Sequence, residues 1–106
     1  MNSLVRIALL QTKCVANKEA NLKHIEAAVR EAAQNKAKMC VLGEVVNSPY
    51  EKKYMREFAE DLNDSPTLRL LQSLSKECGV YTVCSIAERA EGGKLYNTGL
   101  VVLSWR

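Results

Sequence analysis

Residues 39–44, Met-Cys-Val-Leu-Gly-Glu, decide the fold class of this 106-residue chain. The first four are apolar, and a short apolar run that ends in a turn residue is typical of a buried strand. Gly43 and Glu44 follow directly at the carboxyl end of that strand. The neighbouring segments show which kind of sheet it belongs to.

A second apolar run at residues 4–11 predicts another strand. Both of its faces are apolar apart from Arg6 and Gln11, so we expect an interior strand that is covered on both sides. Between the two runs, Asn17 is a good N-cap for a helix that ends near Asn35. The apolar stripe of this helix consists of Leu22, Ile25, Val29 and Ala32. Strand, helix and strand in this order predict a parallel pair with a crossover helix.

The best-delimited element is the helix that follows Ser65. Ser65 can cap it, Pro66 fits its first turn, and Gly79 fits just past its end. Its apolar stripe consists of Leu68, Leu71 and Leu74. Residues 51–61, which precede it, are charged and weakly amphipathic and favour a short helix.

Two more strands are expected at residues 80–86 and 95–104. The loop between them contains Gly92 and Gly93, which predicts a hairpin rather than another crossover. Together the elements predict one α/β domain over residues 1–106, with an at least partly parallel, mixed sheet of four or more strands and two main helices.

Composition and charge exclude several classes of function. The net charge of +3 comes from lysines spread along the chain, without a basic stripe that contains aromatic residues, so no nucleic acid partner is expected. No apolar run approaches membrane-spanning length and the first residues do not form a signal peptide, which predicts a cytoplasmic protein and no membrane association. We expect no metal and no cofactor.

The four cysteines are expected to be reduced thiols, because there is no secretory signal and none of their spacings is a metal-ligand pattern. Cys40 and Cys84 fall inside apolar strand-like runs, where a cysteine is most often a small buried hydrophobic residue. Cys84, which precedes Ser85 near a strand end, is also a weak candidate for a nucleophile. The buried interpretation is favoured for both.

Glu44 is the residue with the strongest claim to an active site. In open α/β sheets, ligands collect beyond the carboxyl ends of parallel strands, and Glu44 lies just past such an end. A carboxylate at this place can act as a general base. The alternative is a glutamate that is solvated or caps a backbone group, and position alone favours that alternative.

A longer pattern around Glu44 changes this balance. Residues 41–50 are Val-Leu-Gly-Glu-Val-Val-Asn-Ser-Pro-Tyr, and residues 93–98 are Gly-Lys-Leu-Tyr-Asn-Thr. Together with the strand–helix–strand start, they resemble the nitrilase superfamily of carbon-nitrogen hydrolases, particularly its omega-amidase branch. Residues 6–11, Arg-Ile-Ala-Leu-Leu-Gln, are similar to members of the family as well. The resemblance covers essentially the whole chain.

The resemblance implies the N-terminal part of a four-layer α-β-β-α sandwich, with a glutamate, a lysine and a cysteine in the active site. In such a site the glutamate takes the thiol proton, the cysteine attacks an amide carbonyl, and the lysine stabilises the oxyanion. Only the glutamate maps onto this chain, as Glu44, the general base. We therefore expect a partial domain, truncated at its C-terminal end and inactive alone.

Other residues have more than one interpretation. Tyr50 ends a loop that lies close to the substrate pocket in the omega-amidase branch, so it is a candidate for substrate binding, and a buried structural tyrosine is an equal alternative. Asn97 is expected to be a structural hydrogen-bonding residue, and His24 to lie in solvent. Gly43 stands where the family usually has proline, which leaves the backbone before Glu44 less restrained. Cys84 stands where the family usually has glycine.

Two functions remain open. The first is the N-terminal portion of an amidase that hydrolyses small omega-amides to the acid and ammonia, with a small-molecule amide as substrate and a homo-oligomeric assembly, as the resemblance implies. The second is a non-catalytic truncated variant that acts as an interaction or oligomerisation piece. Half of a sandwich leaves one sheet face and an apolar edge strand near residues 100–103 uncovered, and such surfaces favour association.

Overall fold

The computed structural model describes residues 4–104. Its sheet has the strand order β1-β2-β3-β4, where the strands are β1 (Ile7–Leu9), β2 (Met39–Val41), β3 (Tyr81–Arg89) and β4 (Leu95–Val102). The first three strands are parallel, and β4 pairs with β3 in the antiparallel sense. The predicted mixed sheet and its hairpin are confirmed.

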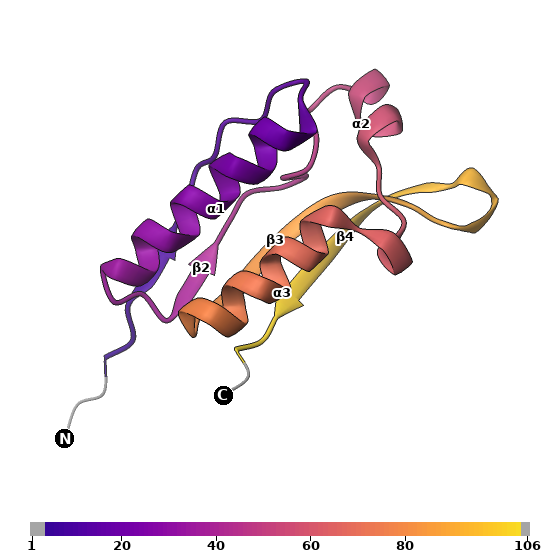
Figure 1. The fold of residues 1–106 in the computed structure, drawn as a ribbon. Coiled ribbons are helices and arrows are strands. Elements are labelled where there is room, and N and C mark those ends of the chain that lie inside the picture. Colours follow the sequence, from indigo (N-terminus) through magenta and orange to yellow (C-terminus); the bar gives the residue numbers. More distant parts are fainter. Residues whose placement is uncertain (1–3, 105–106) are drawn as a thin grey trace.

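Three α-helices accompany the sheet in the described part of the chain: α1 (Lys18–Gln34), α2 (Lys52–Phe58) and α3 (Pro66–Cys78). Figure 1 shows α1 and α3 side by side over one face of the sheet, with α2 beyond the start of α1. None of the helices within residues 4–104 is long and apolar enough to cross a membrane.

Capping residues explain where the two long helices begin and end. The Asn17 side chain accepts a hydrogen bond from the backbone N–H of Ala20 at 2.9 Å. The Ser65 hydroxyl likewise accepts from the N–H of Leu68 at 3.0 Å. Gly79 ends α3 in the left-handed conformation, with φ 68°, which other residues adopt only at a steric cost. All three capping predictions are confirmed.

The hydrophobic core lies between the helix pair and one face of the sheet. Its largest fully buried apolar side chains are Ile25, Val29, Leu71, Leu74, Val80 and Ile86. The cross-strand row that faces the helices consists of Ala8, Cys40, Thr82 and Val102. The predicted stripe of α1 is correct except at Leu22, which is half-buried, while the neighbouring Asn21 is buried.

The opposite face of the sheet carries no helix in the described structure (Figure 1). We call it the open face, and it presents Ile7, Leu9, Met39, Val41, Tyr81, Val83 and Val101. Leu9 is 79% exposed and Val101 is 65% exposed. The prediction of a first strand that is interior and covered on both sides is therefore wrong for the described residues. Within these residues, β1 lies at the edge of the sheet because no further strand pairs with it. In addition, no layer covers its second face there.

We expect the 106-residue chain to associate or to be poorly soluble, because the open face exposes a continuous apolar surface. A lysine there, in Val101→Lys, should shift the chain toward the monomer in light scattering after size exclusion. Ser73→Lys adds the same charge on the exposed surface of α3 and should not. A wild-type monomer with a sharp cooperative unfolding transition would contradict this expectation.

Candidate active site

Glu44 lies at the carboxyl edge of the sheet, as predicted. Its side chain is exposed and lines a hollow of about 310 Å³. The walls come from residues 10–12 and 14, which follow β1, and from residues 43–46 and 48–50, which follow β2. These are the carboxyl ends of two neighbouring parallel strands, where ligands collect in sheets of this kind.

Tyr50 lines the same hollow and is 71% exposed. The alternative of a buried structural tyrosine is therefore wrong for the described residues, while the predicted role in substrate binding stays a prediction. Two other polar residues can be placed as well. His24 is exposed, as expected, but Asn97 is exposed too, so the interpretation of Asn97 as a structural hydrogen-bonding residue, which assumed burial, is wrong.

A strained turn follows Glu44 directly. Val45 has φ 49°, a left-handed conformation that costs a β-branched residue about 1–3 kcal/mol. Its side chain is nevertheless buried, in a small apolar cluster with Met55, Ala59 and Ala87. Strain of this kind persists only where the surrounding structure over-determines the backbone.

Ser85 on β3 holds this turn in place. Its hydroxyl accepts a hydrogen bond from the N–H of Val45, and its carbonyl accepts one from the N–H of Val46, both at 2.9 Å. On the other side of Glu44, the carbonyl of Gly43 accepts a longer bond from the N–H of Ser85 at 3.4 Å. A Cβ at position 43 would meet no atom within 4 Å. The freedom that glycine adds is thus opposed by bonds to Ser85 on both sides of Glu44.

Asn47 fixes the next part of the loop through the backbone of Ala87. Its side-chain oxygen accepts from the N–H of Ala87 at 2.8 Å, and its amide nitrogen donates to the Ala87 carbonyl at 3.1 Å. The same nitrogen lies 3.3 Å from the carbonyl of Phe58 and 3.3 Å from Oε2 of Glu60. Asn47 is fully buried, so these partners replace the water that its amide would otherwise bind.

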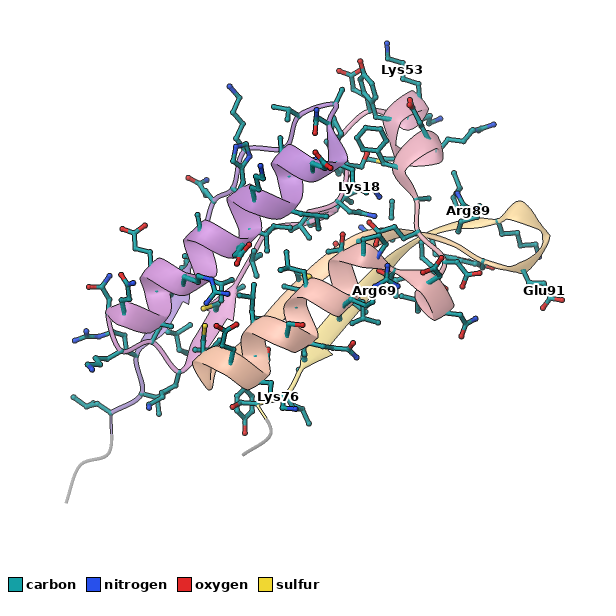
Figure 2. All side chains as sticks on the ribbon, viewed as in Figure 1. Lys18, Lys53, Arg69, Lys76, Arg89 and Glu91 are labelled. Carbon is teal, nitrogen blue, oxygen red and sulfur yellow. The ribbon has the colours of Figure 1, made fainter. Side chains whose placement is uncertain are left out.

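Glu60 is a buried carboxylate at the centre of these contacts, and only 4% of its surface is exposed. Lys18 at the start of α1 donates to Oε2 at 2.7 Å, and Figure 2 shows Lys18 at the end of α1 nearest to α2. Thr67 donates to the carboxylate from its hydroxyl at 2.7 Å and from its backbone N–H at 3.0 Å. The hydroxyl of Ser65 donates to Oε1.

These donors decide the protonation state of Glu60. Burial by itself raises the pKa of the Glu60 carboxyl, because it disfavours the charged form. The hydrogen bonds from Lys18, Ser65 and Thr67 favour that charged form and together outweigh burial, so the pKa lies below its ordinary value. Glu60 is therefore an ionised, fully partnered buried group.

The sequence did not reveal the roles of Glu60, Asn47 and Ser85. Glu60 belongs to residues 51–61, whose many charges look like a solvated surface, and Lys18 lies 42 positions away in the chain. Ser65 as a capping residue, with Thr67 in the first turn of α3, is a local sequence signal of an anion site at the start of this helix. That signal does not say which anion lies there.

The cysteines are all unpaired, as expected. Cys40 and Cys84 are buried, which confirms their interpretation as small hydrophobic residues. Burial raises the pKa of the Cys84 thiol to about 11, which disfavours the thiolate that a nucleophile needs. Cys14 lines the hollow beside Glu44, where its thiol donates to the carbonyl of Val46 at 3.3 Å.

The stability of the chain should depend on the ionisation of Glu60. Since the folded state lowers its pKa, the stabilisation is complete above the ordinary pKa of 4.5 and is lost as the pH falls through the lower value of the folded state. Glu60→Gln should remove this part of the pH dependence in urea titrations. It should also destabilise the chain at neutral pH by about 1–3 kcal/mol, because buried donors lose a charged acceptor. An unchanged pH dependence in this variant would contradict the assignment.

Comparison with known proteins agrees with this arrangement. The model of the carbon-nitrogen hydrolase family matches residues 6–106. Omega-amidase NIT2 of Xenopus tropicalis is 40% identical over 93 residues, which are 88% of this chain and 33% of the relative. Human omega-amidase NIT2 is 38% identical over 93 residues, with the same coverage. The chain thus spans about a third of the length of these relatives.

Solved structures show the same fold over part of their length. Saccharomyces cerevisiae Nit3, a member of branch 10 of the nitrilase superfamily, matches with a TM-score of 0.86 and 25% identity, over 94% of this chain and 40% of that one. A superfamily protein from Xanthomonas campestris matches with a TM-score of 0.82 and 22% identity, over 94% of this chain and 37% of that one. With its family match over residues 6–106, this chain belongs to the carbon-nitrogen hydrolase family of the nitrilase superfamily.

Proposed function

We propose that this chain is the N-terminal portion of an amidase that hydrolyses small omega-amides to the corresponding acid and ammonia. Glu44 acts in it as the general base. It takes the proton of a cysteine thiol, the thiolate attacks the amide carbonyl, and a lysine stabilises the oxyanion. Glu44 returns that proton to the leaving nitrogen, the tetrahedral intermediate releases ammonia, and water hydrolyses the resulting thioester to the acid and the free thiol.

The place of Glu44 is the observation that carries this proposal. Its exposed carboxylate lines a hollow at the carboxyl ends of two parallel strands, next to a backbone turn that is strained and firmly held. Tyr50 lines the same hollow and is our candidate for contact with the substrate. The relatives named as omega-amidases support the choice of an omega-amide.

The open face supports the finer proposal of a four-layer α-β-β-α sandwich. Strands with apolar side chains on both faces are typical of a sheet that is covered on both sides. In the described chain, helices cover only one of the faces. We infer that a second sheet covers the open face in the complete enzyme. We also propose that the complete enzyme forms a homo-oligomer.

The open face also favours a second candidate function. A chain that carries it without a covering sheet can act as a non-catalytic interaction or oligomerisation piece. The authentic transcript distinguishes the two functions. A lysine after a Tyr-Arg-like pair and a cysteine before an aromatic and an acidic residue, downstream in the same frame, support the amidase, whereas an in-frame stop supports the interaction piece.

We expect no ammonia release from omega-amides or glutamine analogues by the purified 106-residue chain. Burial raises the pKa of the Cys14 thiol beside Glu44 and of the Cys84 thiol, which disfavours the thiolate, and loss of an activated nucleophile removes several orders of magnitude in rate. The measurement is a coupled ammonia assay. Turnover that survives stringent purification would overturn this expectation and the interpretation of Cys84 as a buried hydrophobic residue.

In a longer product that contains the cysteine and the lysine, Glu44→Gln should lower kcat by about 10²–10⁴-fold, because the amide cannot accept the thiol proton. Glu51→Gln changes a nearby exposed carboxylate in the same way and should leave kcat unchanged. Equal activity of Glu44→Gln and wild type would exclude Glu44 as the base.

A further inference from the structure

We propose that Glu60 is a positioning residue for Glu44, because its buried carboxylate holds the loop that carries the base in its strained conformation. This inference rests on the proposed role of Glu44 and adds a residue that lies outside the hollow. Glu60 does not line that hollow, so it acts through the loop and not on a substrate.

Several segments of the chain meet at the Glu60 carboxylate. Lys18 comes from the start of α1, Ser65 and Thr67 come from the start of α3, and Asn47 comes from the loop after Glu44. A buried carboxylate must keep such donors, because an unpaired buried charge is very costly. Its charge therefore fixes three segments that are distant in sequence relative to one another.

Glu60 is linked to the loop after Glu44 by a direct contact and by shared hydrogen-bond acceptors. The direct contact between Oε2 and the Asn47 amide is long, at 3.3 Å, but the two residues also share an acceptor. The carbonyl of Ala87 accepts from the Asn47 side chain at 3.1 Å and from the backbone N–H of Glu60 at 3.0 Å. The carbonyl of Phe58 similarly accepts from Lys18 at 2.8 Å and from Asn47 at 3.3 Å. Through these shared acceptors, Glu60 and Lys18 fix the position of the Asn47 side-chain amide.

Asn47 in turn restrains the backbone that follows Glu44. Residues 45–47 are pinned to β3 at both ends, since Ser85 holds the N–H groups of Val45 and Val46, and Ala87 holds Asn47. The strained φ of Val45 requires such restraint from both sides. If the restraint at Asn47 weakens, the turn can relax, and the direction of the Glu44 side chain changes with it.

Amide hydrogen exchange in the 106-residue chain tests the proposal without reference to activity. We expect Glu60→Gln to raise the exchange rates of the Val45, Val46 and Ala87 amides by at least about tenfold relative to core amides such as Leu71, because a lost bond to a charged group is worth that factor in a local opening equilibrium. Gln presents one acceptor oxygen and two N–H donors to a pocket lined with donors.

Ile25→Val is the matched control. It removes one methylene from the core and lowers the stability of the whole chain, yet Ile25 is not a partner of Glu60. It should raise the amide exchange rates of the loop and of the core by the same factor. If Glu60→Gln raises the exchange rates of the loop and core amides equally, or does not raise those of the loop, Glu60 contributes to general stability only. Either result would overturn the proposal.

Lys18→Met serves if Glu60→Gln does not fold, since it removes one donor and leaves the carboxylate with its other partners. We expect a smaller preferential rise at Val45 and Val46, and a rise no greater than at Leu71 would overturn the proposal. A complete enzyme would add a kinetic readout, a fall in kcat without a matching rise in KM. Since the exchange experiment reads no turnover, its failure leaves the amidase proposal standing, and a lack of amidase activity leaves the exchange result interpretable.

Discussion

The buried carboxylate of Glu60 needs hydrogen-bond donors, and this need organises the end of the molecule where α1 and α3 begin and the loop after β2 lies. Glu60 lies within a segment that leaves α2, pairs with the backbone of β3 and leads into α3. A carboxylate there is tolerated only with several donors, and the chain supplies them from α1, from α3 and from the loop after β2. The charge thereby joins α1, α3 and the loop after β2 at this end of the sheet.

A second constraint acts along the sheet itself. The row of Ala8, Cys40, Thr82 and Val102 packs under the two long helices, whereas the row of Leu9, Val41, Val83 and Val101 lies on the open face. Because successive side chains of a strand point to opposite faces, strands with apolar residues at every position require two apolar partners. The described chain provides one of them.

These two constraints meet at the candidate site. Parallel pairing of β1 and β2 brings the segments that follow them together and creates the hollow at Glu44. The bonds of Ser85 and Asn47 then fix the backbone around the carboxylate. The fold provides the place for a base, and the polar contacts beneath the loop provide its orientation. A general base needs both, because proton transfer depends on a short, aligned approach to the donor.

The sequence by itself determined the order of elements, their caps and the candidate base, because apolar periodicity, Asn17, Ser65 and Gly79 act over a few residues. It did not determine which layers cover the sheet, so β1 was expected to be interior, and it predicted a structural amide at Asn97, whereas the buried amides are those of Asn21 and Asn47. Only the tertiary structure decided that Glu60, Lys18 and Asn47 form one site. Their contacts join residues that are 13 to 42 positions apart, and a local pattern cannot show whether a charged side chain will find donors at such distances in the chain.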